Sequence, residues 1–145
     1  MKLNVASIKT RLQKLEQYIA ELKRQQSLTL KQFERDFTVQ LAVERAFQAA
    51  TECCTDVGNH IISVYGLERP EVQRDVFLIL ARMGYLDDEY AQRMSEMVSF
   101  RNLIVHIYWS IDVQRLYRYL HEDVALFEKF RTFALQIIEA EESGD

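Results

Sequence analysis

Residues 36–66 read DFTVQLAVERAFQAATECCTDVGNHIISVYG, and this stretch decides the fold of the chain. Apolar side chains recur in it every three or four residues, which is the spacing of one face of an α-helix. The members of this stripe are Val43, Phe47, Ala50, Cys54, Val57, Ile61 and Val64. Gly66 can adopt the left-handed conformation that ends many helices. The pattern therefore predicts one long helix from Asp36 to Tyr65.

Helical spacing also governs the segments on either side. A first helix is expected over residues 4–24, and Thr29 with Gln32 forms a capping-box pattern that opens a short helix over residues 30–34. A third helix is expected from Pro70 to about Met83, with Gly84 as its stop.

Two more helices are expected in the last third of the chain. One starts at Asp87 or Asp88 and runs into residues 101–108. The other is capped by Asp112 and carries the apolar positions Val113, Leu116, Leu120, Val124, Phe127, Ala134 and Ile137. These patterns predict an all-α, up-and-down helical bundle with about five main helices.

Length and composition agree with this class. A chain of 145 residues is long enough for one apolar core, so we expect a single domain over residues 1–145 with a frayed tail at about 140–145. One proline and four glycines leave too little turn material for an all-β or α/β fold.

Charge and targeting signals restrict the functional classes. The formal net charge is −4, so any contact with nucleic acid is expected to be local rather than spread over a basic surface. No apolar run reaches the roughly 18 residues that span a membrane, and the first residues lack a signal-peptide core. Cys53 and Cys54 are sequence neighbours without partners elsewhere, which favours a reducing cytoplasm.

The octapeptide RNLIVHIY, residues 101–108, is the strongest functional candidate. Arg101 can pair with phosphate oxygens, His106 can move a proton near neutral pH, and Tyr108 offers a phenol that can accept a phosphoryl group. Spacing alone leaves open the commoner roles of a packed histidine and an arginine in a surface ion pair. Tyr108 and Trp109 also serve more often in packing than in chemistry.

A helical wheel divides this segment into two faces. Phe100, Leu103, Ile104, Ile107 and Ile111 form a core-facing stripe, and the opposite face collects Arg101, Asn102, Val105, His106, Tyr108 and Trp109. Aromatic groups ringed by polar ones more often meet a partner than water, so we expect a homodimer contact here. Arg101 and His106 lie about 140° apart on the wheel, which favours a site completed by a second chain or by a distorted helix.

The run from Arg101 and Asn102 to His106 and Tyr108, followed by Ile111 and Asp112, resembles the signature of the HEPN superfamily and most closely that of its HepT-like toxins. Residues 43–48 with 56–62 resemble that family's long second helix, and Met83-Gly84-Tyr85-Leu86 resembles its glycine turn. The likeness covers roughly residues 5–138.

The resemblance implies the toxin of a type VII-like toxin–antitoxin system, a metal-independent endoribonuclease without cofactors that acts on RNA such as tRNA or mRNA. In such a toxin, Arg101 and His106 are the catalytic residues of an Arg-x4-His site in a dimer cleft, and Asn102 orients the histidine. An MntA-like nucleotidyltransferase antitoxin would neutralise the toxin by transferring AMP to Tyr108. The resemblance also allows toxin and antitoxin to assemble into a higher hetero-oligomer.

Several assignments keep an alternative. Asp56 and His60 lie with Arg45 and Glu52 on the polar side of the long helix, where they either support the cleft or form a solvated face with local ion pairs. Arg115 and Arg118 either add local positive charge or make surface salt bridges. The alternative function is a non-catalytic HEPN module that binds a nucleotide or RNA, or that serves as a scaffold for its partner.

Overall fold

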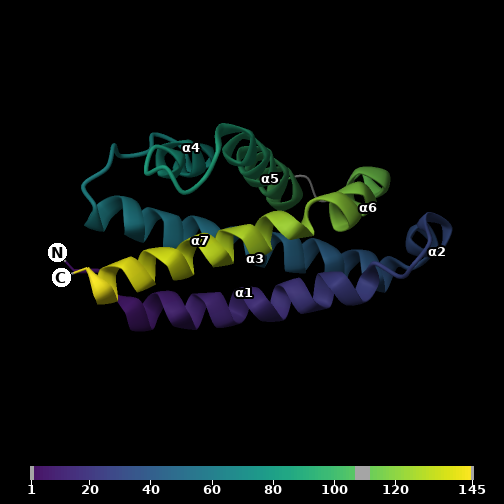
Figure 1. Ribbon diagram of the computed structural model, residues 1–145. Coiled ribbons are helices and arrows are strands. Elements are labelled where there is room, and N and C mark those ends of the chain that lie inside the picture. The colour runs from purple at the N-terminus through teal and green to yellow at the C-terminus, as the bar shows by residue number, and fades with distance from the viewer. Residues whose placement is uncertain (1, 107–111, 145) are drawn as a thin grey trace.

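The computed structural model describes residues 2–106 and 112–144, without the side chains of Val105 and His106. Over these residues the regular structure is entirely helical, which confirms the all-α prediction (Figure 1). The elements in chain order are α1 (Val5–Gln25), α2 (Leu30–Arg35), α3 (Phe37–Val64), the 3-10 turn η1 (Gln73–Asp75), α4 (Val76–Ala81), α5 (Asp88–His106), α6 (Val113–Glu122) and α7 (Val124–Ser143).

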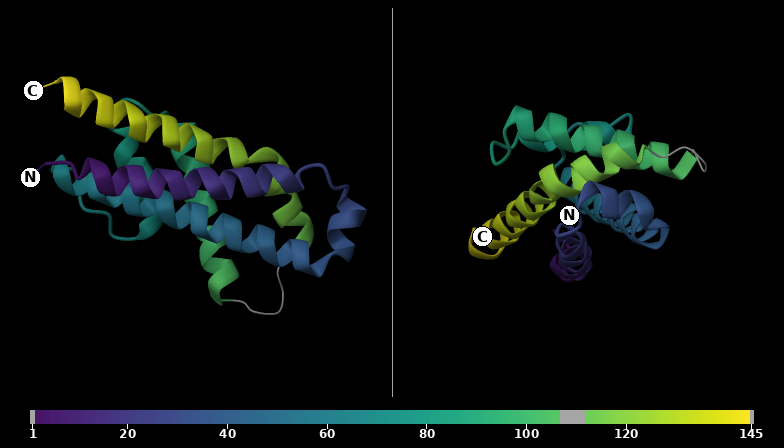
Figure 2. Two further views of the ribbon diagram at one scale, coloured as in Figure 1. Left: turned by 90° about the horizontal axis from the view of Figure 1, so that it is seen from below. Right: turned by 90° about the vertical axis from the view of Figure 1, so that its right-hand side faces the viewer.

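Three long helices, α1, α3 and α7, form the body of the bundle. They lie alongside one another with both chain ends at the same end of the bundle (Figures 1 and 2), where Lys9 Nζ lies 3.9 Å from Glu142 Oε1. The short α4 and the longer α5 form a layer on the side of α3 and α7 that faces away from α1 (Figure 2, right). In the described part of the chain, no helix is long and apolar enough to cross a membrane.

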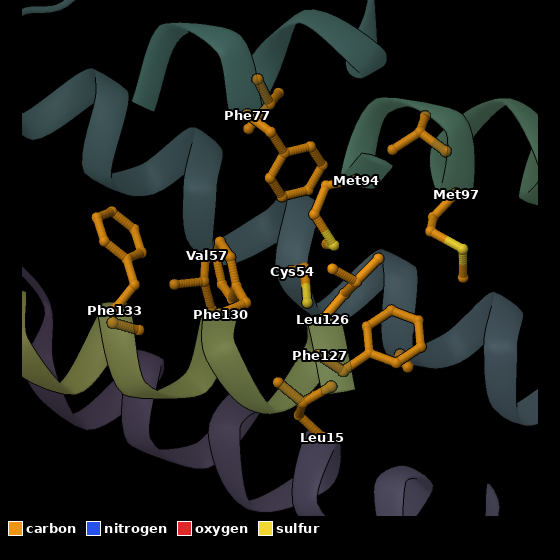
Figure 3. Packing of buried hydrophobic residues seen from close by; sticks show 14 of the residues in the cluster. Leu15, Cys54, Val57, Phe77, Met94, Met97, Leu126, Phe127, Phe130 and Phe133 are labelled. Atoms are coloured by element: carbon orange, nitrogen blue, oxygen red, sulfur yellow. The ribbon is translucent and has the colours of Figure 1, made fainter. Parts of the chain in front are cut away.

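The core lies where these layers meet. Cys54 and Val57 of α3 face Phe127, Phe130 and Phe133 of α7, with Phe77, Met94 and Leu15 added from α4, α5 and α1 (Figure 3). Phe77 and Phe130 meet edge to face, with ring centroids 5.8 Å apart. Full burial of a side chain of this size stabilises the fold by about 1.5–3 kcal/mol. The predicted stripe of α3 is therefore confirmed as its core face.

Two glycines end helices as the sequence indicates. Gly66 follows α3 with a φ of 62°, and Gly84 lies beyond α4 with a φ of 90°. A side chain at either position would strain the backbone, because L-residues with a Cβ seldom adopt such angles. The capping box is also present, since the Thr29 side chain accepts from Gln32 N while Gln32 Oε1 accepts from Thr29 N.

The helix predicted to start at Pro70 begins later than expected. Residues 67–72 are irregular, and Val72 is extended with φ −134° and ψ 157°. Tertiary contacts oppose a helix here, because the Ser95 hydroxyl of α5 donates to the Arg74 carbonyl at 2.6 Å and Asn59 of α3 pairs with Gln73 at 3.0 Å. Pro70 therefore lies in an irregular segment rather than in a first helical turn.

The last predicted helix is two helices. The chain turns at Asp123, whose backbone has φ −116° and ψ −1° and whose side chain is buried. Its carboxylate pairs with Arg93 of α5, and this tertiary contact holds the chain in the turn. Asp is also a weak helix former, so the break costs little locally. Beyond it, α7 continues to Ser143, into the segment expected to fray.

Candidate functional site

Arg101 lies near the end of α5 and is held by two side chains. Its Nη2 donates to Glu52 Oε1 of α3 at 2.5 Å, and its Nη1 donates to Asn102 Oδ1 at 3.1 Å. The Arg101 side chain is 29% exposed and that of Glu52 is 37% exposed. A charge-assisted hydrogen bond of this length fixes the orientation of the guanidinium plane.

A polar cavity of about 350 Å³ opens beside this pair. Its lining comes from three segments, namely Thr51, Glu52, Thr55 and Asp56 of α3, Gln73 of η1, and Val98, Arg101 and Asn102 of α5. Arg101 Nε is buried and has no hydrogen-bond partner among the described residues. A buried donor without an acceptor is costly to keep. Arg131 Nε of α7, which lies beside Glu16 and another cavity, is in the same state, so an unmet donor does not by itself mark a binding site. Arg101 is set apart by its place in the octapeptide.

The remainder of the octapeptide is described only in part. The α5 helix continues through His106, so the position of His106 lies five helical steps, or about 140°, around the axis from that of Arg101. The side chain of His106 and the whole of Tyr108 lie outside the described residues. Ile107 and Ile111 of the predicted core stripe, and Trp109 of the opposite face, also lie outside them.

One member of the predicted core stripe faces solvent. Phe100 is buried and Ile104 packs partly against the core, but Leu103 is 44% exposed in the single chain. The prediction that Leu103 points into the core was wrong, because α5 presents Phe100 to Tyr119 and Arg115 of α6 instead. Leu103 thus adds apolar surface next to the candidate site.

The two supporting residues predicted on α3 lie in different surroundings. Asp56 lines the cavity of Arg101 and lies 3.9 Å from Arg11 Nε of α1. His60 accepts a hydrogen bond at its Nε2 from the backbone amide of Asn4, at 2.9 Å, and so joins α3 to the start of α1. The structure therefore brings Asp56, but not His60, to the cavity beside Arg101.

The two arginines after the motif are engaged within α6. Arg115 donates to the Tyr119 hydroxyl from Nε at 3.2 Å and from Nη2 at 3.1 Å, and its guanidinium lies 5.0 Å from the Phe100 ring centroid. Arg118 lies 3.9 Å from Glu122 Oε2. The contact of Arg118 matches the predicted alternative of a surface salt bridge, whereas Arg115 packs against aromatic side chains.

Five lining residues of the cavity were not predicted from the sequence as parts of the site, namely Thr51, Glu52, Thr55, Gln73 and Val98. Glu52 was recognised only as a member of the polar face of the long helix, and Gln73 was expected inside a helix. Glu52 pairs with Arg101, and Gln73 lines the same cavity, only through tertiary packing, for which a single sequence carries no signal. Over the part of the chain that the structure describes, no group of three or more His, Cys, Asp or Glu side chains is arranged to hold a metal ion.

The sequence of this chain is similar to a family of known proteins. A family model described as "Ribonuclease HepT-like" matches residues 11–134. The chain is 31% identical over 110 residues to the "mRNA nuclease HepT" of Shewanella oneidensis, covering 76% of this chain and 80% of the relative. It is 28% identical over 110 residues to the "tRNA nuclease HepT" of Aphanizomenon flos-aquae, covering 76% and 75%.

The fold is also found among solved structures. A tri-AMPylated HEPN toxin of Shewanella oneidensis, solved in complex with its MNT antitoxin, superposes with a TM-score of 0.80 at 26% identity and covers 90% of this chain and 96% of the toxin. The resemblance noted in the octapeptide thus extends over nearly the whole chain. The family model covers well over half of the residues, and this protein therefore belongs to the HepT-like ribonuclease family.

Proposed function

We propose that this protein is a metal-independent endoribonuclease toxin whose reaction centre is built around Arg101 and His106. The observation that carries this proposal is the orientation of Arg101, a residue of the octapeptide, by Glu52 and Asn102 at a polar cavity. Membership of a ribonuclease family supports the same chemistry.

The reaction is an intramolecular attack within RNA. The 2′-oxygen of a ribose forms a bond to the adjacent phosphorus, and the bond from phosphorus to the 5′-oxygen of the next nucleotide breaks. His106 takes the proton of the 2′-hydroxyl or gives a proton to the departing 5′-oxygen. The products are a 2′,3′-cyclic phosphate and a 5′-hydroxyl, and water is not consumed in this step.

Arg101 supplies the electrostatic part of the mechanism. A guanidinium that is held in advance can stabilise the charge that grows on the phosphate oxygens without first reorganising. Glu52 acts as a positioning residue through its hydrogen bond to Nη2, which leaves the other guanidinium donors for the phosphate. Asn102 accepts a hydrogen bond from Nη1 and is a second positioning residue for Arg101. It also orients His106, which lies four residues later. Asp56 completes the polar wall of the cavity, while His60 contributes by holding α3 against α1.

A second copy of the chain completes the site in this proposal. The positions of Arg101 and His106 differ by about 140° on α5, so one straight helix does not direct both toward one phosphate. Two α5 helices related by a twofold axis can bring an arginine and a histidine to each side of one cleft. The exposed Leu103 supports an apolar contact at that place.

Tyr108 is the proposed site of inhibition. A nucleotidyltransferase partner transfers AMP when the phenol oxygen attacks the α-phosphorus of ATP, the phenol proton is lost and pyrophosphate leaves. The attached AMP adds bulk and negative charge two residues from His106 and competes with RNA for Arg101. The AMPylated Shewanella oneidensis toxin, bound to its antitoxin, supports this form of regulation.

The reaction is tested with unmodified protein and RNA in the presence of EDTA. We expect cleavage that leaves 2′,3′-cyclic phosphate ends, detected by mass spectrometry of the fragments, and loss of cleavage in His106→Ala. His121→Ala is a matched control, because His121 contacts the Tyr117 and Gln26 carbonyls away from the site. Equal cleavage by the His106→Ala and His121→Ala variants would remove His106 from the mechanism.

Inhibition has its own test. Incubation with the cognate nucleotidyltransferase and ATP should add the mass of one or more AMP units and stop cleavage. Tyr108→Phe should abolish the mass increase. An AMP adduct that persists in Tyr108→Phe places the modification at another residue.

A further inference from the structure

A second cavity adjoins the cavity of Arg101. It has a volume of about 780 Å³ and lies between the last turns of α3 and the segment from Gly66 to Gln73, which includes the irregular residues 67–72. Gln73 and Asn102 line both cavities, so the two form one groove that starts at Arg101 and extends along α3. The volume lies within the range of pockets that enclose small organic ligands, about 300–1,000 Å³.

The outer wall of this groove is held in place by tertiary contacts. Gly66 turns the chain away from α3 with its positive φ, and Val72 is extended. The far end of the wall is fixed by the hydrogen bond from Ser95 to Arg74. Where η1 leads into α4, a Cβ on Gly58 would lie 2.6 Å from Val76 Cγ1, so this glycine allows the close approach that seats the wall on α3. The groove is therefore formed before any ligand binds.

The lining offers the contacts that a single-stranded nucleotide uses. Arg69 supplies a cation that has no ion-pair partner within 4.0 Å among the described residues, although the Glu71 carboxylate also lines the groove. Asn59 Nδ2 donates to Gln73 Oε1 at 3.0 Å, which leaves one amide oxygen and one amide nitrogen of this pair for other partners. Leu67 and the 48% exposed Val72 add apolar surface. Bases of unpaired RNA are bound through edge hydrogen bonds and stacking, and their phosphates through cations.

We propose that this groove, from Arg101 to Arg69, binds the nucleotides of a single-stranded RNA that flank the scissile phosphate. The inference rests on the proposed ribonuclease function and adds a path for the substrate. Arg69 contacts a phosphate next to the cleaved one, and the amide pair of Asn59 and Gln73 contacts a base edge. Because the groove is local and polar, it provides an RNA site on a protein whose net charge is −4.

The test measures binding separately from cleavage. A fluorescent RNA hexamer with a 2′-O-methyl group on every ribose cannot undergo 2′-hydroxyl attack, so its affinity is read by anisotropy on unmodified protein. Arg69→Gln should weaken binding about tenfold, as expected for the loss of one hydrogen bond to a charged group. The slope of log K against log salt should fall by about 0.7, the contribution of one phosphate in a single strand.

Arg82→Gln is the matched control. Arg82 lies near Arg69 at the end of α4 but pairs with Glu68 and does not line the groove. This variant removes the same charge and should leave the affinity within about twofold of that of the wild type, since exposed charges contribute little. Asn59→Ala tests the amide pair and should weaken binding severalfold without changing the salt slope. If that variant does not fold, the affinity of Arg69→Gln still decides the test, because Arg69 is exposed and its substitution does not disturb the core.

The remaining outcomes distinguish a failure of the groove proposal from a failure of the ribonuclease proposal. Unchanged hexamer affinity in Arg69→Gln, or an equal loss in Arg82→Gln, overturns the groove and leaves the ribonuclease proposal intact. Binding that depends on Arg69, together with no cleavage of an all-ribose hexamer, overturns the ribonuclease proposal and leaves the groove. If Arg69→Gln binds RNA normally but no longer forms a complex with the nucleotidyltransferase partner, the groove is a protein-docking site and the RNA path is wrong.

Discussion

Two arginines of α5 each pair with a carboxylate on another helix, yet their surroundings differ. Arg93 binds Asp123 at the turn between α6 and α7, and its Nη2 lies 3.4 Å from the Glu122 carbonyl oxygen. Arg101 binds Glu52 beside a cavity and keeps a buried Nε without a partner. An ion pair alone therefore does not mark a functional arginine. The adjoining space and the unmet donor distinguish Arg101 from Arg93, and its place in the octapeptide distinguishes it from Arg131, which has both features.

The largest expected difference between the two pairs is in catalysis. Arg101→Ala should lower the rate of RNA cleavage at saturating substrate at least about 100-fold, a typical cost of removing one preorganised donor to a developing negative charge. Arg93→Ala should leave the rate per folded molecule unchanged. Initial rates at equal folded fraction, judged by circular dichroism, make this comparison. A similar loss in both variants would show that α5 arginines act through the fold.

Glu52 should show a smaller catalytic effect than Arg101. Glu52→Gln keeps the shape of the side chain but removes the charge that assists the hydrogen bond to Nη2, and we expect about a tenfold lower kcat with little change in KM. A positioning role also predicts that Glu52→Asp recovers part of the rate. A faster reaction in Glu52→Gln would mean that Glu52 restrains Arg101 rather than orienting it.

Asp123 should affect stability instead. Its side chain is 10% exposed and that of Arg93 is 43% exposed, so Asp123→Asn leaves a partly solvated arginine without its carboxylate. We expect a loss of about 1–2 kcal/mol in the free energy of unfolding, less than for a fully buried pair because water screens Arg93. Urea unfolding measures it. Glu52→Gln provides the contrast, with a change of less than about 1 kcal/mol.

The smallest expected difference between the two ion pairs is in the alkylation rate of a thiol of α3. Burial raises the pKa of the Cys54 thiol well above its ordinary value, so the reactive thiolate is scarce near neutral pH. In a Cys53→Ser background, Asp123→Asn should speed alkylation of Cys54 by opening the core, whereas Glu52→Gln should not. Mass spectrometry over time measures the rates, and equal acceleration by both variants would place both pairs in the same structural role.

The parts of the fold that sequence reasoning predicted well are those set by neighbouring residues. The stripe of α3, the capping box at Thr29 and the turns at Gly66 and Gly84 depend on contacts within a few positions, and all four are confirmed. The start at Pro70 was missed because Ser95, 21 residues away from Arg74, holds that segment in another conformation. The break at Asp123 was missed for the same reason, since its partner Arg93 lies 30 residues away.

The residues of the candidate site show the same division between local patterns and long-range contacts. Arg101, Asn102, His106 and Tyr108 could be proposed from the sequence because they follow one another in a short motif, whereas Glu52 lies 49 residues from Arg101 and is joined to it only by folding. The cavity itself depends on the irregular segment that was predicted to be helical. Local patterns thus suggested the chemical groups, and the tertiary structure added the partners of Arg101 and the space around it.

Chemical rescue tests the central claim most directly. If the cavity beside Glu52 and Asn102 holds a catalytic guanidinium, added guanidinium ion at non-denaturing concentration should restore part of the RNA cleavage lost in Arg101→Ala, with saturation. The wild type and Arg93→Ala should not respond. Full activity of Arg101→Ala without added guanidinium would contradict the account.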